Sequence, residues 1–332
     1  MDEKMEKILT VSIAAYNVYN YLNETLTPFL GVKGNDRLEV LIIDDGATDG
    51  TLELALEYQE KYPNVFRVIH KENGGWGSTV TTGILNATGK YFKLLDGDDY
   101  YNKDELERLL DQLETCDYDM VITPFLRFYD NSDRIDYVKN PLFEVSSPRQ
   151  IELNELPIKP YCMEMYSLAF KTNLIQQNQV QITEHCFYTD NEYVVKCSSL
   201  CKTAIVMPYC IYCYRLARPG QSVSVDGMRK HYKEFELILR KMLTYVKQNV
   251  TNKHLQELFY ERYRGLSYYY YETLFLMGAG KEYKMAMKSY DQWLKKEFPD
   301  IYKKISYRYI KIMRVTNYYG FGLIAKHCVE KK

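Results

Sequence analysis

The chain has 332 residues, of which 46% are hydrophobic and 26% charged, which is the composition of a globular protein. This length is enough for roughly two domains. Lysine and arginine number 43 against 44 aspartates and glutamates, so no overall positive charge favours nucleic acid as a partner. No apolar run approaches the roughly 18 residues of a membrane-spanning helix, and the N-terminal segment lacks the features of a signal peptide. We therefore expect a cytoplasmic protein.

The eight cysteines indicate neither disulfides nor a metal site. In a long chain without an export signal, thiols stay reduced. The closest pairs are Cys197 with Cys201 and Cys210 with Cys213, and the interval between the pairs is too short for a four-thiolate zinc site. We interpret these side chains as buried thiols.

The N-terminal part of the chain alternates strand and helix signals. Short apolar runs predict strands at 9–16, from 38 to the aspartates at 44 and 45, at 65–70, at 90–95 and at 120–125. Apolar residues at helical spacing predict helices that follow Asp49, span 77–89 and follow Asn102. Strands that alternate with helices in this way favour a mainly parallel sheet covered by helices on both faces.

Beyond about residue 226 the pattern becomes helical. Apolar residues recur at helical spacing in three sets, at 235–246, 255–266 and 283–293. We therefore predict an α/β domain over residues 1–225 and a helical appendage over residues 226–332.

Carboxylates gather where two of the predicted strands end. Asp44 and Asp45 follow one strand, and Asp96, Asp98 and Asp99 follow another. Ligands of open α/β sheets bind at the carboxyl ends of the strands, so this edge is the candidate site. Neighbouring carboxylates repel one another unless a cation neutralises them, and their oxygens suit Mg²⁺ or Mn²⁺ shared with substrate phosphates. A solvated Asp/Gly turn is the alternative interpretation.

Three further motifs contain polar or flexible residues. The segment ENGGWGST (72–79) has glycines that permit close backbone approach to a ligand, but it lacks the ending of a Walker A loop. Asp190 precedes a helical pattern and is either a general base or a helix N-cap. Arg215 and Arg218 are candidates for binding phosphate, with a solvated hairpin tip as the alternative.

Taken together and in order, the motifs resemble those of a known family. VSIAAYN, IIDDGATDGT, NGGWGSTVTTGILNATGKYFKLLDGDDYY, YTDNEY and YRLARPGQSVS are similar to the successive signatures of family 2 glycosyltransferases. The resemblance covers about residues 8–225 and is greatest to bacterial enzymes that build capsules or other cell-surface glycans. It implies the GT-A fold, a nucleotide-binding α/β domain with a mainly parallel sheet flanked by helices.

The resemblance implies a nucleobase pocket after the first strand. Ala14, Tyr16 and Asn17 would line this pocket, with the Tyr16 ring stacked on the base. Asp45 would accept a hydrogen bond from uracil, and turn or helix-cap chemistry is the alternative for its segment.

The resemblance also implies a metal site and a general base. Asp96 and Asp98 would form the Asp-x-Asp element, with Asp96 near the ribose, Asp98 on the metal and Gly97 in the same binding turn. Mn²⁺ or Mg²⁺ would bridge the diphosphate and stabilise the leaving group. Asp190 would deprotonate the acceptor hydroxyl, which attacks the anomeric carbon in line and inverts its configuration.

The chain departs from the family in the helix after the glycine loop. Many members carry an arginine there, whereas this chain has Thr81 and Thr82. The departure weakens the expectation that a side chain of this helix binds the diphosphate. Lys71, Arg218 and His231 are the candidates to replace it.

The C-terminal region beyond Ile301 is basic and aromatic. It contains Lys303, Lys304, Arg308, Lys311, Arg314 and Lys326 among Tyr302, Tyr307, Tyr309, Tyr318 and Tyr319. A basic amphipathic helix can lie on an anionic membrane surface, so we expect peripheral contact at the inner face of the membrane. A solvated basic helix packed by tyrosines is the alternative.

The predicted function is an inverting, metal-dependent transfer of a hexose or N-acetylhexosamine from a UDP-sugar. The acceptor would be a hydroxyl of a glycan or of a lipid-linked saccharide in surface polysaccharide synthesis. The alternatives are a catalytically silent homologue that binds another transferase, and a nucleotidyltransferase, against which the sequence AAYNVYN argues because such enzymes place a Gly-rich basic loop there. The prediction requires that Asp98 and Asp190 meet in one cleft.

Overall fold

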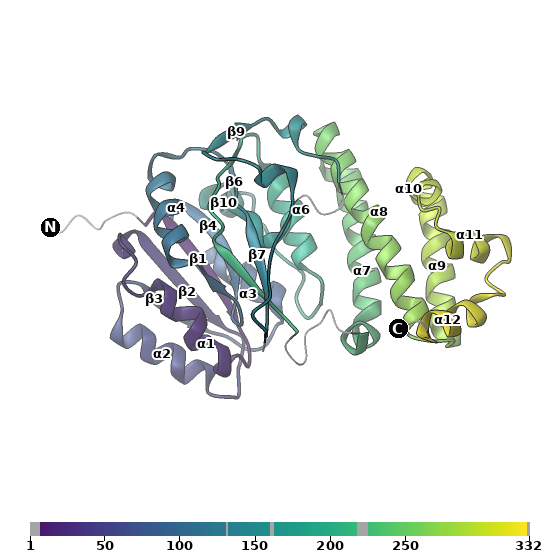
Figure 1. The fold of residues 1–332 in the computed structure, drawn as a ribbon, viewed down its shortest axis with the longest axis horizontal. Coiled ribbons are helices and arrows are strands. Elements are labelled where there is room, and N and C mark those ends of the chain that lie inside the picture. Colours follow the sequence, from purple (N-terminus) through teal and green to yellow (C-terminus); the bar gives the residue numbers. More distant parts are fainter. Residues whose placement is uncertain (1–6, 131, 160–162, 218–224, 331–332) are drawn as a thin grey trace. The chain divides into compact units, whose positions relative to one another are not determined.

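The structure of the chain is a computed structural model that describes residues 7–130, 132–159, 163–217 and 225–330. The chain divides into two compact units (Figure 1). The first comprises residues 1–157 and 162–218, and the second comprises residues 158–161 and 219–332.

The first unit is built on an eight-stranded sheet in the order β3-β2-β1-β4-β10-β6-β11-β9. Strands β3, β2, β1 and β4 run parallel to one another, and β11 runs parallel to β6. Strand β10 runs antiparallel to β4 and β6, and β9 runs antiparallel to β11. Parallel pairs still predominate, so the prediction of a mainly parallel sheet is confirmed. The strands are β1 (Leu9–Ala15), β2 (Leu38–Asp44), β3 (Phe66–His70), β4 (Tyr91–Asp96), β6 (Met120–Ile122), β9 (Arg149–Ile151), β10 (Leu168–Lys171) and β11 (Ala204–Val206).

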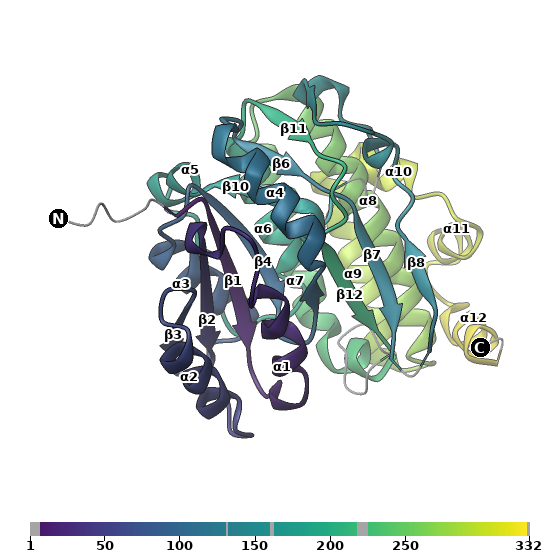
Figure 2. The same ribbon diagram turned by 60° about the vertical axis from the view of Figure 1, so that its left-hand side comes forward.

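A second, four-stranded sheet has the order β5-β12-β7-β8. Figure 2 shows β12, β7 and β8 side by side. The single strand predicted at 120–125 is wrong, because the chain leaves the first sheet after Ile122 and enters the second at Phe125. Pro124 lies at this change of sheet, where a residue without a backbone N–H is tolerated. The strands are β5 (Tyr100–Tyr101), β7 (Phe125–Tyr129), β8 (Ile135–Tyr137) and β12 (Tyr212–Leu216).

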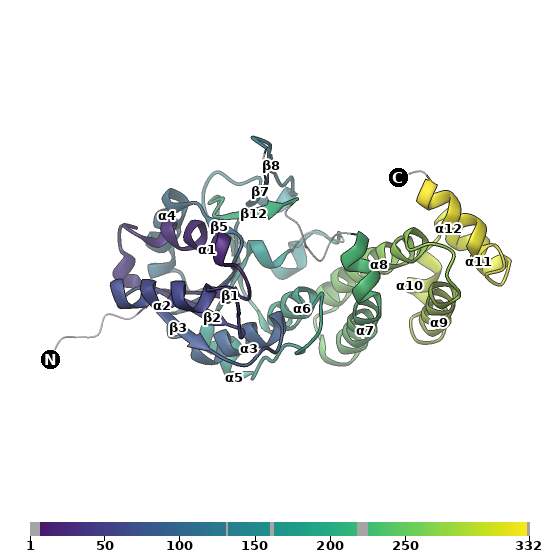
Figure 3. The ribbon, with the colours of Figure 1, turned by 90° about the horizontal axis from the view of Figure 1, so that it is seen from below.

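Helices cover both faces of the large sheet (Figure 3). Helices α1 and α4 lie on one face, and α3, α5 and α6 lie on the other. The α-helices of this unit are α1 (Tyr19–Leu26), α2 (Thr51–Lys61), α3 (Trp76–Asn86), α4 (Lys103–Thr115), α5 (Thr172–Gln177) and α6 (Asp190–Leu200). Short 3-10 helices span Thr27–Phe29 (η1), Asn35–Arg37 (η2), Pro141–Phe143 (η3), Leu153–Glu155 (η4) and Met165–Ser167 (η5).

Two helix boundaries have clear local causes. The side chain of Asn102 accepts a hydrogen bond from the Glu105 backbone N–H, which caps α4 where the sequence predicts. Helix α3 ends at Asn86, three residues before the predicted end at Gly89. A Cβ at Gly89 would lie 2.6 Å from the backbone nitrogen of Thr10, so only glycine fits where the chain turns back against β1.

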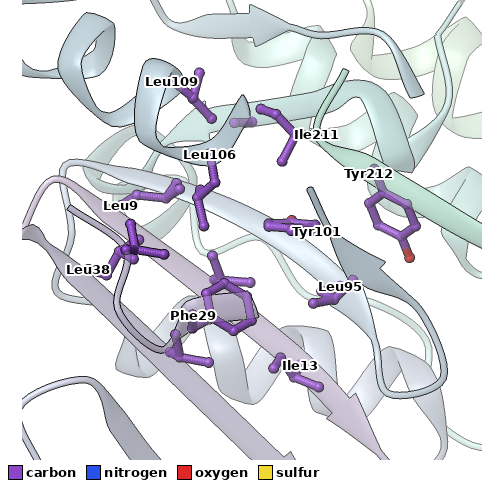
Figure 4. Packing of buried hydrophobic residues seen from close by; sticks show 14 of the residues in the cluster. Leu9, Ile13, Phe29, Leu38, Leu95, Tyr101, Leu106, Leu109, Ile211 and Tyr212 are labelled. Atoms are coloured by element: carbon purple, nitrogen blue, oxygen red, sulfur yellow. The ribbon is translucent and has the colours of Figure 1, made fainter. Parts of the chain in front are cut away.

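The main hydrophobic core lies between the sheet and the helices on the α1 and α4 face. Alternate residues of β1, among them Leu9 and Ile13, belong to this core together with Leu106 and Leu109 of α4 (Figure 4). These four side chains have no solvent-exposed surface, and burying a leucine or isoleucine stabilises the fold by about 1.5–3 kcal/mol. The core therefore fixes the position of β1. The carboxyl end of this strand belongs to the candidate site.

The second unit is helical, as predicted from the periodicity beyond residue 226. Its buried Asp291 accepts hydrogen bonds from Arg314, Tyr271 and Tyr318, which ties three helical segments together. Among the helices of the described residues, none is both long and apolar enough to span a membrane. The helices are α7 (Val225–Asn249), α8 (Lys253–Leu276), α9 (Lys281–Glu297), α10 (Pro299–Lys304), α11 (Arg308–Val315) and α12 (Phe321–Glu330).

The cysteines within the described ranges are free thiols, as expected. Cys197, Cys201 and Cys213 are buried, and Cys210 is partly buried. Burial raises the pKa of the Cys210 thiol to about 11 and that of Cys213 to about 12. These thiols therefore stay protonated and unreactive at neutral pH.

Candidate functional site

The carboxyl ends of β2, β1 and β4 meet at one edge of the large sheet. The register pairs Ala15 with Asp44 and Ala14 with Asp96, so the segments that follow these strands start side by side. Asp45 begins the segment after β2, and its backbone N–H donates to the carbonyl of Ala15. The sequence predicts that Asp45 and Asp96 lie at the same edge of the sheet, and the strand pairing confirms this prediction.

A tight turn connects β4 to β5 and contains the acidic motif. The N–H of Gly97 donates to the carbonyl of Ala14 over 3.1 Å. A Cβ at Gly97 would lie 2.8 Å from that carbonyl oxygen and 2.9 Å from a methyl group of Val18, so the turn requires glycine. Asp98 follows with only 9% of its surface exposed. The turn thus holds the main chain of the Asp-Gly-Asp motif against the loop after β1.

Asp99 is the buried member of the acidic cluster. Its carboxylate accepts hydrogen bonds from the Tyr212 hydroxyl over 2.6 Å and from the Arg215 backbone N–H over 2.7 Å. Burial raises the pKa of Asp99 well above its usual range, and the nearby charges of Asp98 and Asp96 raise it further. Asp99 therefore anchors the turn to β12.

The predicted phosphate role of Arg215 is wrong, because its side chain is buried in ion pairs. The guanidinium pairs with Asp130 over 2.5 Å and with Glu24, and its Nε donates to the carbonyl of Asp98 over 2.7 Å. Only 7% of the side chain is exposed. Arg215 therefore stabilises the acidic turn through its hydrogen bond to the Asp98 carbonyl. Because the side chain is buried, the alternative interpretation as part of a solvated hairpin tip is also wrong for Arg215. Arg218 lies outside the described residues.

Asp96 ends β4 and is held at two atoms. Its Oδ1 accepts a hydrogen bond from the indole N–H of Trp76 over 2.7 Å. Its backbone N–H donates to the Tyr212 hydroxyl over 3.1 Å. Tyr212, which sequence analysis did not single out, thus contacts both Asp96 and Asp99.

Asp45 binds the glycine loop that follows β3. Its Oδ1 accepts hydrogen bonds from the Lys71 ammonium over 2.8 Å and from the N–H of Gly74 over 3.0 Å, and Ser78 Oγ lies 3.2 Å away. Its Oδ2 accepts from the N–H of Gly75 over 2.8 Å. Asp45 is 1% exposed. A uracil N–H that donated to this carboxylate would therefore add to the hydrogen bonds that it already accepts from the glycine loop. Lys71, a candidate for the diphosphate, is paired with Asp45.

The loop after β1 is exposed and tied to the loop after β2. Asn17 adopts a left-handed conformation, with φ of 53°, and its side-chain oxygen accepts from the backbone N–H of Thr48 over 2.8 Å. Tyr16 is 50% exposed, and Ala14 is partly buried. An exposed tyrosine ring beside a strand end has a face available for stacking.

Asp190 is the first residue of α6. The N-cap position belongs to Thr189, so the alternative prediction that Asp190 caps the helix is wrong. Asp190 is partly buried, and its Oδ1 accepts from the side-chain amide of Asn191 over 3.1 Å.

Tyr166 belongs to η5, which packs against both β4 and α6. Its ring stacks on that of Tyr214, with centroids 4.4 Å apart. Burial raises the pKa of Tyr166 well above its usual range, and the charges of Asp96, Asp190 and Asp99 raise it further. The rings of Phe92 in β4 and Tyr193 in α6 lie 6.5 Å apart, so the fold brings the helix that begins at Asp190 next to the strand that ends at Asp96.

The acidic turn provides donors of the kind that Mg²⁺ and Mn²⁺ prefer. Asp96 and Asp98 present carboxylate oxygens, and a cation beside them would offset the repulsion that Asp99 experiences. Within the described ranges, no three His, Cys, Asp or Glu side chains are grouped so that they could hold a metal alone. The residues therefore fit an ion that completes its coordination with substrate phosphates and water.

His231 lies on α7 in the second unit. Its Nδ1 is 2.8 Å from a carboxylate oxygen of Glu234, one turn later on the same helix. The structure therefore gives His231 a local ion-pair partner, and its predicted role at the diphosphate stays a prediction.

The fold, with its large sheet flanked by helices, is similar to that of GT-A transferases. Over residues 10–175 the chain matches the model of the family described as "Glycosyl transferase family 2". The chain belongs to this family of glycosyltransferases.

Curated relatives agree with this assignment. The chain is 32% identical over 171 residues to the uncharacterized glycosyltransferase EpsJ of Bacillus subtilis, an alignment that covers 52% of this chain and 46% of EpsJ. It is 30% identical over 168 residues to the uncharacterized glycosyltransferase RP339 of Rickettsia prowazekii, with 51% and 49% covered. The chain thus spans about half the length of these curated relatives.

Solved structures share the fold at low sequence identity. The TarS fragment 1–349 of S. aureus, in complex with UDP-GlcNAc, superimposes with a TM-score of 0.62 at 16% identity, covering 96% of this chain and 92% of that one. The mannosyltransferase PcManGT of Pyrobaculum calidifontis, in complex with GDP-Man and Mn²⁺, gives a TM-score of 0.56 at 16% identity, covering 97% and 84%. Both likenesses extend over nearly the whole chain, including the helical region.

Proposed function

We propose that this glycosyltransferase is an inverting, metal-dependent enzyme that transfers a hexose or N-acetylhexosamine from a UDP-sugar. The acceptor is a hydroxyl of a glycan or of a lipid-linked saccharide, in the synthesis of a surface polysaccharide. The observation that supports the proposal is that η5 packs against both β4, which ends at Asp96, and α6, which begins at Asp190. A donor-binding carboxylate and a base for the acceptor are what a single displacement needs.

The proposed roles follow from the positions of these groups. Ala14, Tyr16 and Asn17 line the nucleobase pocket, with the exposed Tyr16 ring stacked on the base. Asp45 accepts a hydrogen bond from uracil and also holds the glycine loop. The complex of TarS with UDP-GlcNAc supports a uridine nucleotide as the donor.

The proposed reaction needs no covalent intermediate. The acceptor hydroxyl oxygen forms a bond to the anomeric carbon while the bond from that carbon to the diphosphate breaks. Asp190 takes the hydroxyl proton, and UDP leaves on the opposite face, which inverts the configuration. Held by Asp96 and Asp98, Mn²⁺ or Mg²⁺ would supply Lewis-acid stabilisation of the diphosphate. PcManGT, whose complex contains Mn²⁺, supports the choice of metal.

The test is the release of UDP from a panel of UDP-sugars in the presence of Mn²⁺ and saccharide acceptors. We expect acceptor-dependent release of free UDP from one or a few of these donors, and its loss when a chelator removes the metal. Release of pyrophosphate in a parallel reaction, which contains UTP and a sugar 1-phosphate in place of the UDP-sugar, would instead identify a nucleotidyltransferase. Calorimetry that detects no metal-dependent UDP binding would identify a catalytically silent homologue.

We further propose that the C-terminal region contacts an anionic membrane surface from the cytoplasm. Residues 281–332 contain thirteen lysines and arginines against five aspartates and glutamates, although the whole chain has a net charge of −1. Three apolar or aromatic side chains of α11, α12 and their connection are unusually exposed: Val315 is 87%, Tyr319 84% and Leu323 79% exposed. Exposed apolar groups with surrounding basic charge are typical of interfacial attachment.

We expect the protein to float with vesicles of phosphatidylcholine and phosphatidylglycerol, and not with phosphatidylcholine alone. Replacing Val315 and Leu323 by serine should weaken vesicle binding about tenfold, because the apolar contribution is lost. Leu85→Ser is the matched control, since Leu85 is 65% exposed on α3 of the other unit. Equal flotation of all variants, or none with anionic vesicles, would contradict this proposal.

A further inference from the structure

Trp76 is the one tryptophan of the first unit, and its indole contacts the acidic end of β4. It is the first residue of α3 and is partly buried. Its N–H donates to Oδ1 of Asp96 over 2.7 Å, a short distance for a hydrogen bond from a neutral donor. A hydrogen bond to an ionised carboxylate is among the stronger kinds, so the indole restricts rotation of the Asp96 side chain.

The glycine loop, residues 72–75, is hydrogen-bonded to Asp45, directly after β2, and these bonds restrict the backbone before Trp76. Asp45 accepts hydrogen bonds from the N–H groups of Gly74 and Gly75, the two residues directly before Trp76. Gly75 has φ of 80° and ψ of 172°, a conformation that L side chains rarely adopt. The direction of the Trp76 indole toward Asp96 therefore depends on the backbone conformation of Gly75, the residue directly before it.

The opposite side of the glycine loop packs on the segment that leads to α6. The N–H of His185 donates to the carbonyl of Gly74 over 2.6 Å. A Cβ at Gly77 would collide with the carbonyl oxygen of Thr183, so the two backbones approach more closely than any other residue would permit. The side chain of Thr183 in turn donates to Glu192 of α6 over 2.6 Å. The loop is therefore fixed at both sides.

The geometry points to Trp76 as a positioning residue for donor binding. It fixes the Asp96 carboxylate in the orientation that meets the ribose and diphosphate of the nucleotide-sugar, and the Asp45 contacts hold the indole in place. This inference rests on the proposed function, in which Asp96 binds the donor. A residue that orients a group used in ground-state binding affects KM more than kcat.

Trp76→Phe removes the N–H and keeps an aromatic ring. We expect the KM for the UDP-sugar and the dissociation constant of UDP to rise about tenfold, as for loss of a hydrogen bond to a charged group. We expect kcat to fall by less than donor affinity does, because Asp98 and the base Asp190 are unchanged. Trp293→Phe is the matched control, since Trp293 packs against Tyr290 and Phe298 in the second unit. Unchanged donor affinity in Trp76→Phe would overturn the inference.

The fluorescence of Trp76 itself gives a second measurement of UDP binding, and this measurement needs no substitution at Trp76. The chain contains two tryptophans, so Trp76 is the single tryptophan of the Trp293→Phe protein. We expect UDP to shift its emission in a saturable way, with the dissociation constant found by calorimetry. No shift at saturating UDP would overturn the inference even if Trp76→Phe failed to fold.

The outcomes separate this inference from the proposed function. UDP binding without transfer would refute the transferase proposal and leave the affinity test of Trp76 intact. Transfer at wild-type KM by Trp76→Phe would refute the role of Trp76 and leave the transferase proposal intact. Absence of any UDP binding by the wild-type chain would refute both.

Discussion

Asp190→Asn is expected to lower kcat for glycosyl transfer by about a thousandfold, the usual effect of removing a general base. The amide has the same shape as the carboxylate but cannot take the proton of the acceptor hydroxyl. Its oxygen can still accept from the side chain of Asn191, so the start of α6 keeps its structure. The measurement is the rate of UDP release at saturating donor, and we expect the KM for the donor to stay unchanged.

Glu184→Gln is the control for this variant. Glu184 is an exposed carboxylate in the segment before α6, so it matches the change in charge without touching the site. Wild-type rates from Asp190→Asn would exclude Asp190 as the base. A parallel fall in both variants would assign the effect to local charge rather than to proton transfer.

Asp98→Asn is expected to abolish metal-dependent UDP binding and to reduce transfer on the order of a thousandfold, because Lewis-acid stabilisation of a leaving group contributes several kcal/mol. Asp98 is nearly buried in the turn after β4, so an asparagine fits the same space. Calorimetry with UDP, with and without Mn²⁺, measures the first effect, and UDP release measures the second. Thermal unfolding should change little.

Asp104→Asn is the control for the metal variant, since Asp104 is an exposed carboxylate in the first turn of α4. Metal-dependent UDP binding of wild-type strength by Asp98→Asn would exclude Asp98 as a ligand. The two main variants also have different signatures. Asp190→Asn should bind donor and fail to turn over, whereas Asp98→Asn should lose both properties.

Much of the fold was predictable because its signals are local. The apolar runs that form β1, β2, β3 and β4 and the leucines at helical spacing in α4 predict elements close to those observed. The strand predicted at 120–125 failed because its two halves pair with partners far along the chain: Met120 with Phe170 and Phe125 with Tyr212. Periodicity reports which face is buried and carries no information on the partner strand.

The candidate site shows the same division. The positions of Asp45 and Asp96 followed from the rule that parallel strands end at one edge. Arg215 was misinterpreted because its charge looked available in the sequence, whereas β12 carries it to Asp130 and Asp98. The motif ENGGWGST does not by itself assign a role to Trp76, although its place directly after two glycines is a local signal.

By itself, the amino-acid sequence determined the strands and helices at the N-terminal half, the acidic strand ends and the family, because each depends on residues close together in the chain. Only the tertiary structure decided that α6, which begins at Asp190, packs beside β4, that Arg215 is buried and bonded to the acidic turn, and that the Trp76 indole binds Asp96. These contacts join residues on different strands, helices and loops. Their formation depends on the packing of both sheets, which no local pattern specifies.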